Sequence, residues 1–264
     1  MATLGTSVLT YADWAARMDD NFKTATIVEI LSMTNEILDD MLITEANGVT
    51  GHKTTLRTGI PSGTWRLLNQ GIVPTKSTTA QIVATPGNLE DESQIDVDLL
   101  ALNNNDESFR LSEALGHMEG LNQQMATTLM YGNQAANPER FTGFAPHYNT
   151  VSTASAQSAY NVIDAGGVGS DNTSIWIVTW GERTSLGFFP KGSMAGLRHT
   201  DMGRHRVQDT SQTFATGAYY WAMIDHFKWE LGLAVRDWRY NVRICNIDVS
   251  DLQTVAAANI INLL

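Results

Sequence analysis

A long segment in the N-terminal half restricts the folds open to this chain, because it has the composition of strands and turns and no helical periodicity. Residues 51–102 are rich in Thr, Val and Ile and are interrupted by Gly and Pro. Strand-like runs occur at residues 54–57, 79–83 and 94–99, and the last alternates polar and apolar side chains, as half-buried strands do. We interpret the segment as a long, twisted β-hairpin that projects from the body. Two strands bury little core by themselves, so such a hairpin implies protein partners.

Helical periodicity flanks this segment on both sides. Before it, apolar residues recur at helical spacing, and Asn47-Gly48 can end that helix: Ile27, Ile30, Leu31, Leu38, Met41 and Leu42. After it, a helix is predicted from about residue 106 to 131, with Glu107 favourably placed in its first turn. Gly116 and Gly120 cost this helix about 1 kcal/mol each relative to Ala, which a close packing contact would explain.

The C-terminal half is predicted to contain a loop followed by a sheet. Residues 150–172 are rich in Ser, Ala, Gly and Asn and have the composition of a loop. Four strands then follow, with a turn at 181–183 between the first two and an interruption near Asp237 in the last: 175–180, 185–189, 218–228 and 231–246. A further helix begins near Asp251. Its apolar end at residues 260–264 would be an unusual surface, so we expect the protein to continue beyond it. The whole pattern predicts an α+β chain.

Composition favours contacts with other proteins over contacts with nucleic acid or membrane. Charged residues make up 17% of the chain, against about 25% in an average globular domain. The net charge is −11, which disfavours binding to DNA phosphates. The single cysteine, Cys245, excludes an internal disulfide and is expected to be buried. The first ten residues have no basic signal-peptide region, and no apolar run is long enough to cross a membrane, so we expect synthesis in the cytosol.

No motif for catalysis, cofactor binding or metal binding is present. His117 and Glu119 lack the paired histidines of a zinc-protease helix, and we interpret them as solvated helix residues. His226 and Glu230 would supply only two metal ligands. The glycine-rich run 166–170 lacks the lysine and the strand–turn–helix setting of a phosphate loop. We therefore expect no enzyme activity, no cofactor and no metal.

A basic stretch in the C-terminal half allows three interpretations. Six cationic or histidine side chains lie close together with only Asp201 against them: Lys191, Arg198, His199, Arg204, His205 and Arg206. We favour a solvated loop. Alternatively, the stretch pairs with the acidic segment 90–92, together with Asp96 and Asp98, on a neighbouring copy. Contact with packaged DNA is weaker, given the overall charge.

Four stretches resemble the major capsid proteins of tailed bacteriophages. They are residues 25–40; residues 51–71, GHKTTLRTGIPSGTWRLLNQG; residues 108–143; and residues 222–250, AMIDHFKWELGLAVRDWRYNVRICNIDVS. The resemblance implies the Hong-Kong-97-type capsid fold, with an N-terminal arm, an extended β-hairpin loop, a long spine helix and a long antiparallel sheet in a peripheral domain.

The resemblance also assigns roles to segments. Residues 1–50 look like the N-terminal arm and its helix, and 51–103 like the extended loop that overlaps a neighbouring subunit. Residues 104–250 look like the peripheral domain. The axial domain would begin at 251–264 and lie mostly beyond residue 264, an order that departs from the commonest pattern of the fold.

The function implied is that of a structural major capsid protein. It would self-assemble through hexamers and pentamers into the icosahedral phage head that encloses the genome, in the host cytoplasm, and would reside in the virion. Scaffolding, portal and decoration proteins are further candidate partners, packaged DNA would be contacted only non-specifically, and no membrane is involved. The alternative is an encapsulin-like bacterial compartment shell that encloses an enzyme. A carbohydrate- or peptide-binding module, suggested by seven Trp and seven Tyr, ranks third.

Three side chains of the predicted hairpin are the candidate subunit contacts. Arg and Trp are favoured anchors of protein interfaces, and the segment carries Arg57, Trp65 and Arg66. Local packing within the hairpin is the alternative role for the same residues.

Overall fold

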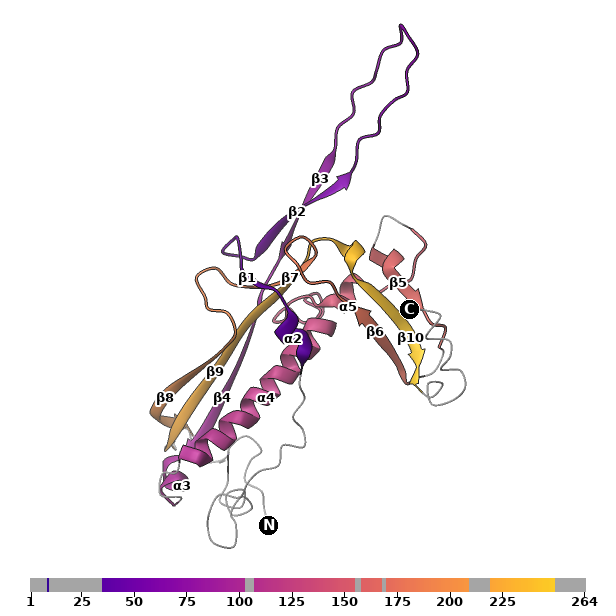
Figure 1. The fold of residues 1–264 in the computed structure, drawn as a ribbon. Helices are drawn as coiled ribbons and strands as arrows, with labels where there is room; N and C mark the ends of the chain where they lie inside the picture. The colour runs from indigo at the N-terminus through magenta and orange to yellow at the C-terminus, as the bar shows by residue number, and fades with distance from the viewer. Residues whose placement is uncertain are drawn as a thin grey trace. The chain divides into compact units, whose positions relative to one another are not determined.

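The computed structural model describes residues 9, 35–102, 107–154, 158–167, 170–208 and 219–249 (Figure 1). Helices and strands are both present, as expected for an α+β fold. The chain divides into two compact units. The first draws on Met1–Glu36, Asn88–Ala126 and Gly196–Trp229, and the second on Ile37–Gly87, Thr127–Ala195 and Glu230–Leu264.

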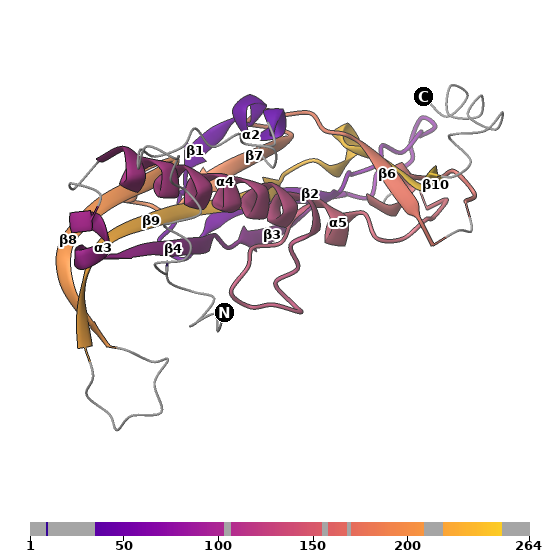
Figure 2. The ribbon, with the colours of Figure 1, turned by 90° about the horizontal axis from the view of Figure 1, so that it is seen from below.

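The first unit combines a helix with a ribbon of long strands. β8 (Leu197–Gln208) runs antiparallel to the first part of β9 (Tyr219–Val235), and β4 (Gly87–Asp96) lies on the other edge of β9. After β4 come the short helix α3 (Val97–Leu102) and α4 (Glu107–Tyr131). Figure 2 shows α4 lying along these strands.

The helix α4 packs on the strands of this unit through an apolar stripe. Ala114 and Leu121 of α4 bury Phe227 of β9, with Leu89 and Leu197 packed against the cluster. A second cluster forms around Phe109 at the start of the helix, together with the buried residues Ile95, Leu99 and Leu100. Spacings of three and four residues place such side chains on one helical face.

The second unit contains three separate groups of strands. β1 (Ile43–Glu45) is parallel to β7 (Ser185–Phe189), which is antiparallel to the end of β9. β5 (Val162–Asp164) and β6 (Asn172–Ile177) flank β10 (Val242–Asp248) in a three-stranded sheet. β2 (His52–Gly59) and β3 (Thr78–Ala84) form a two-stranded hairpin. The short helices of this unit are α2 (Glu36–Asp40, whose first residue falls in the other unit), α5 (Phe144–His147), η1 (Ser158–Asn161) and η2 (Trp238–Tyr240).

The two helix predictions had different outcomes. The long helix is confirmed, since α4 begins and ends within a residue of its predicted bounds. The close packing expected at Gly116 and Gly120 is wrong for the described chain, because a Cβ at either position would meet nothing within 4 Å. The prediction that the first helix ends at Asn47 is also wrong. Instead β1 forms there, and Met41 packs against Gly187 of β7.

The strand predictions failed mainly where pairing is non-local. β6 and β7 exist, but the turn between them does not make a hairpin, since they belong to different sheets. The strands predicted at 218–228 and 231 onward are the single strand β9, whereas the interruption near Asp237 is confirmed. The run at 94–99 is strand only to Asp96, and α3 begins at Val97. The helix predicted from residue 251 lies outside the described residues.

Candidate intersubunit surface

The hairpin of β2 and β3 is paired at its base and open beyond. The register runs from His52↔Ala84 to Gly59↔Thr78, and residues 60–77 form the connection. Figure 1 shows this connection reaching away from the other strands of its unit. At its tip the Gln70 amide donates to the Leu67 carbonyl (3.2 Å), and Asn69 has a φ of 69°. The tip is therefore a tight turn held by its own hydrogen bonds.

Apolar side chains in this connection are largely uncovered by the described part of the chain. Trp65 is as exposed as in an isolated residue (101%). The other large apolar side chains of the connection are 64–89% exposed: Ile60, Leu67, Leu68, Ile72 and Val73. Together with Trp65 we call them the hairpin apolar surface. Exposed apolar clusters of this kind mark interaction sites.

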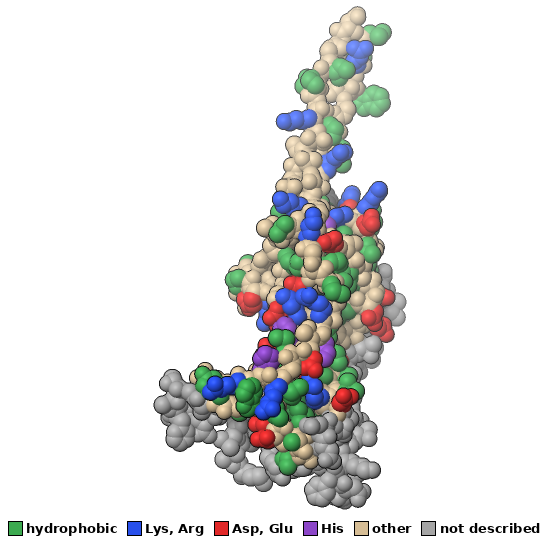
Figure 3. All heavy atoms as spheres, turned by 90° about the vertical axis from the view of Figure 1, so that its left-hand side faces the viewer, with side chains coloured by type: hydrophobic (Ala, Val, Ile, Leu, Met, Phe, Trp, Pro, Cys, Tyr) green, Lys and Arg blue, Asp and Glu red, His purple; other side chains and the backbone are tan. Residues whose placement is uncertain are grey.

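All the charged side chains of this hairpin are cationic, although the net charge of the chain is negative. Residues 46–89 contain Lys53, Arg57, Arg66 and Lys76 and no Asp or Glu, whereas the net charge of the chain is −11. Figure 3 shows Lys, Arg and hydrophobic side chains along the hairpin and no acidic ones. A positive, apolar projection on an acidic protein is suited to contact an acidic protein surface.

The three predicted contact residues lie on this hairpin but not together. Trp65 and Arg66 are adjacent near the tip, whereas Arg57 is on β2 opposite Thr79. The Arg66 guanidinium donates to the Gln70 carbonyl (3.1 Å), so local packing accounts for part of its role. No such contact holds Trp65. The sequence predictions did not include the remaining members of the hairpin apolar surface. The signal that could have identified them is a set of apolar residues, lying among Gly and Pro residues, that does not alternate with polar residues as in a strand.

A groove of about 860 Å³ lies at the base of the hairpin, and its charged lining is mostly cationic. Its charged residues are Lys53, Arg57, Arg183, Arg236, Asp237 and Arg239, and we call it the cationic groove. Asp237 accepts from Arg239 (2.6 and 2.9 Å), and these hydrogen bonds hold the pKa of Asp237 below its usual value. The one carboxylate is thus already neutralised.

His52 fixes one of these arginines. Its Nε2 lies 2.6 Å from Arg236 Nη2, and Arg236 Nη1 donates to the Glu182 carbonyl (2.5 Å). Burial, followed by the charge of Arg236, lowers the pKa of His52. A neutral imidazole can accept from the guanidinium, so the contact leaves the positive charge of Arg236 in place.

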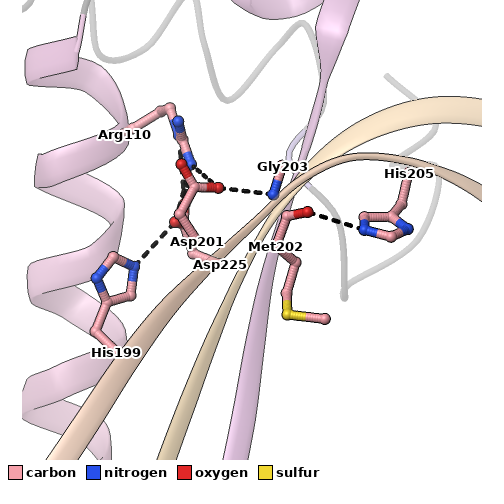
Figure 4. A network of polar contacts seen from close by, with 7 residues as sticks. All are labelled: Arg110, His199, Asp201, Met202, Gly203, His205 and Asp225. Atoms are coloured by element: carbon pink, nitrogen blue, oxygen red, sulfur yellow. Dashed lines mark hydrogen bonds and ion pairs between the residues drawn. The ribbon is translucent and has the colours of Figure 1, made fainter.

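Apart from Lys191, the basic stretch of the sequence lies in strand β8, so its interpretation as a loop is wrong, although Arg204, His205 and Arg206 are exposed. His199 Nε2 lies 2.9 Å from Asp225, which is buried and also accepts from Arg110 at 2.9 Å (Figure 4). Asp201 contacts Arg110 (3.2 Å) and accepts from the Gly203 amide (2.8 Å), where the register of β8 on β9 shifts. The network ties this irregularity of β8 to α4.

The acidic segment that was the alternative partner of the basic stretch on another copy has partners within its own unit. Glu90 contacts Lys228 (3.1 Å) and His226 (3.5 Å). Asp91 lies 2.6 Å from His117, which stacks on Phe227. His117 is therefore a half-buried ion-pairing residue, and its interpretation as a solvated one is wrong. These local pairs weaken the hypothesis that the two segments meet between copies.

The described part of the chain also bears on metal binding and membrane insertion. Within it, no cluster of three or more His, Cys, Asp or Glu residues could hold a metal ion. Its helices include none that is long and apolar enough to span a membrane. Cys245 is buried as expected, and burial raises the pKa of its thiol.

Comparisons with known proteins point to viral shells. A family profile described as major capsid protein GP7 matches residues 19–264. A chain in the structure of bacteriophage Epsilon15 is 40% identical, with a TM-score of 0.74, covering 96% of this chain and 74% of that one. No curated protein matches.

More distant structures share the fold alone. A chain of the native GTA particle capsid is 9% identical with a TM-score of 0.56, covering 92% of this chain and 99% of that one. The SrpI encapsulin of Synechococcus elongatus PCC 7942 is 12% identical with a TM-score of 0.50, covering 92% and 98%.

Proposed function

Because this chain belongs to the family of the major capsid protein GP7, we propose that its copies assemble as hexamers and pentamers into the icosahedral head that encloses a phage genome. As a tailed-phage major capsid protein, it is a component of the virion. The phage relative at 40% identity favours a phage head over the encapsulin-like compartment, whose representative is 12% identical. Family membership also decides against the carbohydrate- or peptide-binding module.

The observation that supports this mode of assembly is the hairpin apolar surface. A Trp side chain buries about 150–250 Å² when covered, and at about 25 cal/mol per Å² this is roughly 4–6 kcal/mol before the costs of association. In the isolated chain this stabilisation is not gained, because Trp65 is fully exposed. We propose that the hairpin overlaps a neighbouring copy, which covers Trp65 and the apolar residues around it.

Assembly on this scheme depends on many modest interfaces rather than on one strong one. Closure of a shell makes each further contact intramolecular, so individually weak contacts suffice. We propose residues 1–50 as the arm, 51–103 as the overlapping loop, 104–250 as the peripheral domain and 251–264 as the start of the axial domain. Scaffolding, portal and decoration proteins remain proposed partners. The packaged genome would be contacted only non-specifically, because the chain carries a net charge of −11.

The test removes the apolar anchor of the hairpin. We expect Trp65→Ser combined with Leu68→Ser to raise the protein concentration needed for shell formation by about tenfold or more, because buried aromatic anchors dominate interface energies. Light scattering and negative-stain imaging over a range of concentration and salt provide the measurement.

The matched control is Tyr160→Ser, which removes an aromatic ring that is 53% exposed but lies outside the hairpin. It should assemble as the unaltered protein does. Normal shell formation by the double hairpin variant would contradict the proposed overlap. A monomer of the unaltered protein at every concentration would contradict assembly altogether.

A further inference from the structure

The cationic groove carries charges that nothing in the described chain neutralises. The side-chain amino group of Lys53 and the guanidinium groups of Arg57 and Arg183 line the groove, and all three residues are exposed. Among the described residues, no carboxylate lies within ion-pair distance of any of them. Arg236 adds a fixed charge at the wall of the groove, held by His52 and the Glu182 carbonyl.

This arrangement suits carboxylates presented by a protein segment. Guanidinium groups bind carboxylates or phosphates through two parallel hydrogen bonds, so the groove chemistry alone allows either anion. Charge decides between them, because a chain of net charge −11 repels a polyanion such as DNA at long range. A short acidic segment of another protein carries too little charge to be excluded in this way.

The chain itself exposes a complementary segment. Within the five residues of α2, Glu36, Asp39 and Asp40 are exposed, and none of the ion pairs of the described residues involves them. The other acidic segment is less available, because Glu90 and Asp91 already pair with Lys228 and His117. The three carboxylates of α2 equal the three unpaired cations of the groove in number and are opposite to them in charge.

We propose that the cationic groove of one copy receives the acidic face of α2 from a second copy. The proposal rests on the assembly function above and adds a specific contact to it, distinct from the hairpin apolar surface. The described chain shows no ion pair between the two sites, so both are available for a pairing between copies. Each charge pair is exposed and therefore modest, but the pairing is repeated in every subunit of a shell.

The test exchanges the signs of the two surfaces. We expect Arg57→Glu with Arg183→Glu to raise the concentration needed for assembly by about tenfold, and Asp39→Lys with Asp40→Lys to do the same, because like charges then face each other. The protein that carries all four changes should regain assembly to within about threefold of the unaltered chain. Lys191→Glu, an exposed charge reversal outside the groove, is the matched control and should have little effect.

The readouts are light scattering for assembly and thermal unfolding for folding, both on the full chain. If the Arg57/Arg183 variant unfolds early, Lys53→Glu replaces it, again with and without the α2 reversal. Failure of the α2 reversal to restore assembly would overturn the proposal. If Glu90→Lys with Glu92→Lys restored assembly of the groove variant instead, this would also overturn the proposal, because it would identify β4 as the segment that the groove receives.

A nucleic-acid role would give a different result. Groove reversal would then abolish binding of a short DNA duplex while leaving empty shells able to form, and this outcome too would overturn the proposal. Failure of the assembly function itself is distinguishable, because the unaltered protein would then form no shells under any condition.

Discussion

Asn241 is a fully buried polar residue whose side chain connects three segments of the second unit. Its amide donates to Ser185 Oγ (2.7 Å) and Tyr148 Oη (3.2 Å), and its carbonyl oxygen accepts from the Thr179 amide (3.1 Å). Tyr148 in turn donates to the Trp238 carbonyl (2.9 Å). The hydrogen bonds of these polar groups therefore depend on one another.

Replacing this residue should destabilise the protein without changing any exposed surface. Asn241→Leu removes the acceptor of the Thr179 amide and leaves the buried Ser185 hydroxyl without its donor, so we expect a loss of about 1–3 kcal/mol in the free energy of unfolding. Denaturant unfolding of the purified protein measures it. Asn149→Leu, at an exposed position, should cost much less. An equal loss in both variants would refute the network as a source of stability.

His117 should make stability depend on pH. Its pKa is raised to about 9, first by Glu113, whose carboxylate lies 3.7 Å from Nε2, and then by the hydrogen bond to Asp91, although burial opposes the charged form. The folded value exceeds that of the unfolded chain, about 6.5, so the stabilisation is complete below that pH and is lost as pH rises toward 9.

The measurement compares His117→Gln with the unaltered protein across this pH window. We expect the variant to be less stable by about 1–2 kcal/mol at pH ~6, and the difference to vanish above pH ~9. A difference that stays constant over the whole range would show that the ring contributes through packing on Phe227 rather than through its charge.

At the scale of elements, α4 carries two glycines that the single chain does not need. A Cβ at Gly116 or Gly120 would meet no atom within 4 Å, so Gly→Ala at both positions should stabilise the protein by about 1–2 kcal/mol in total through helix propensity. Gly132→Ala is the contrasting variant. Its Cβ would lie 2.5 Å from the Thr128 and Phe141 carbonyl oxygens, so it should destabilise.

Thermal unfolding and assembly together show why these glycines are present. If the double alanine variant is more stable and assembles normally, the glycines have no packing role. If it is more stable but assembles poorly, a neighbouring copy packs closely against this part of α4. A loss of stability would contradict the open space around both positions.

At the scale of the whole molecule, charge is distributed unevenly along an acidic chain. Residues 46–89 contain only positive charges, whereas exposed carboxylates gather at α2 and along β4. A protein with complementary regions can attract its own copies while its net charge limits non-specific association. The proposed assembly uses this distribution, and high salt should therefore weaken the groove contact more than the hairpin apolar surface.

Elements whose signal is local could be predicted from the amino-acid sequence. The apolar spacing between Phe109 and Leu129 is contained within one helix, so α4 could be predicted to within a residue. The hairpin could be recognised from its strand runs and its Gly and Pro residues, and Trp65 could be chosen as a contact from residue type alone. Its full exposure agrees with that choice, although its role in assembly is still to be tested.

Features that depend on residues distant in sequence became visible in the folded chain alone. β8 was missed because its side chains are mostly polar and its order comes from pairing with β9. Arg110 meets Asp225 across 115 positions, and the cationic groove combines β2 with Arg183 and residues 236–239. Strand pairing and charge pairing are set by the path of the whole chain, and short windows of sequence contain no information about that path.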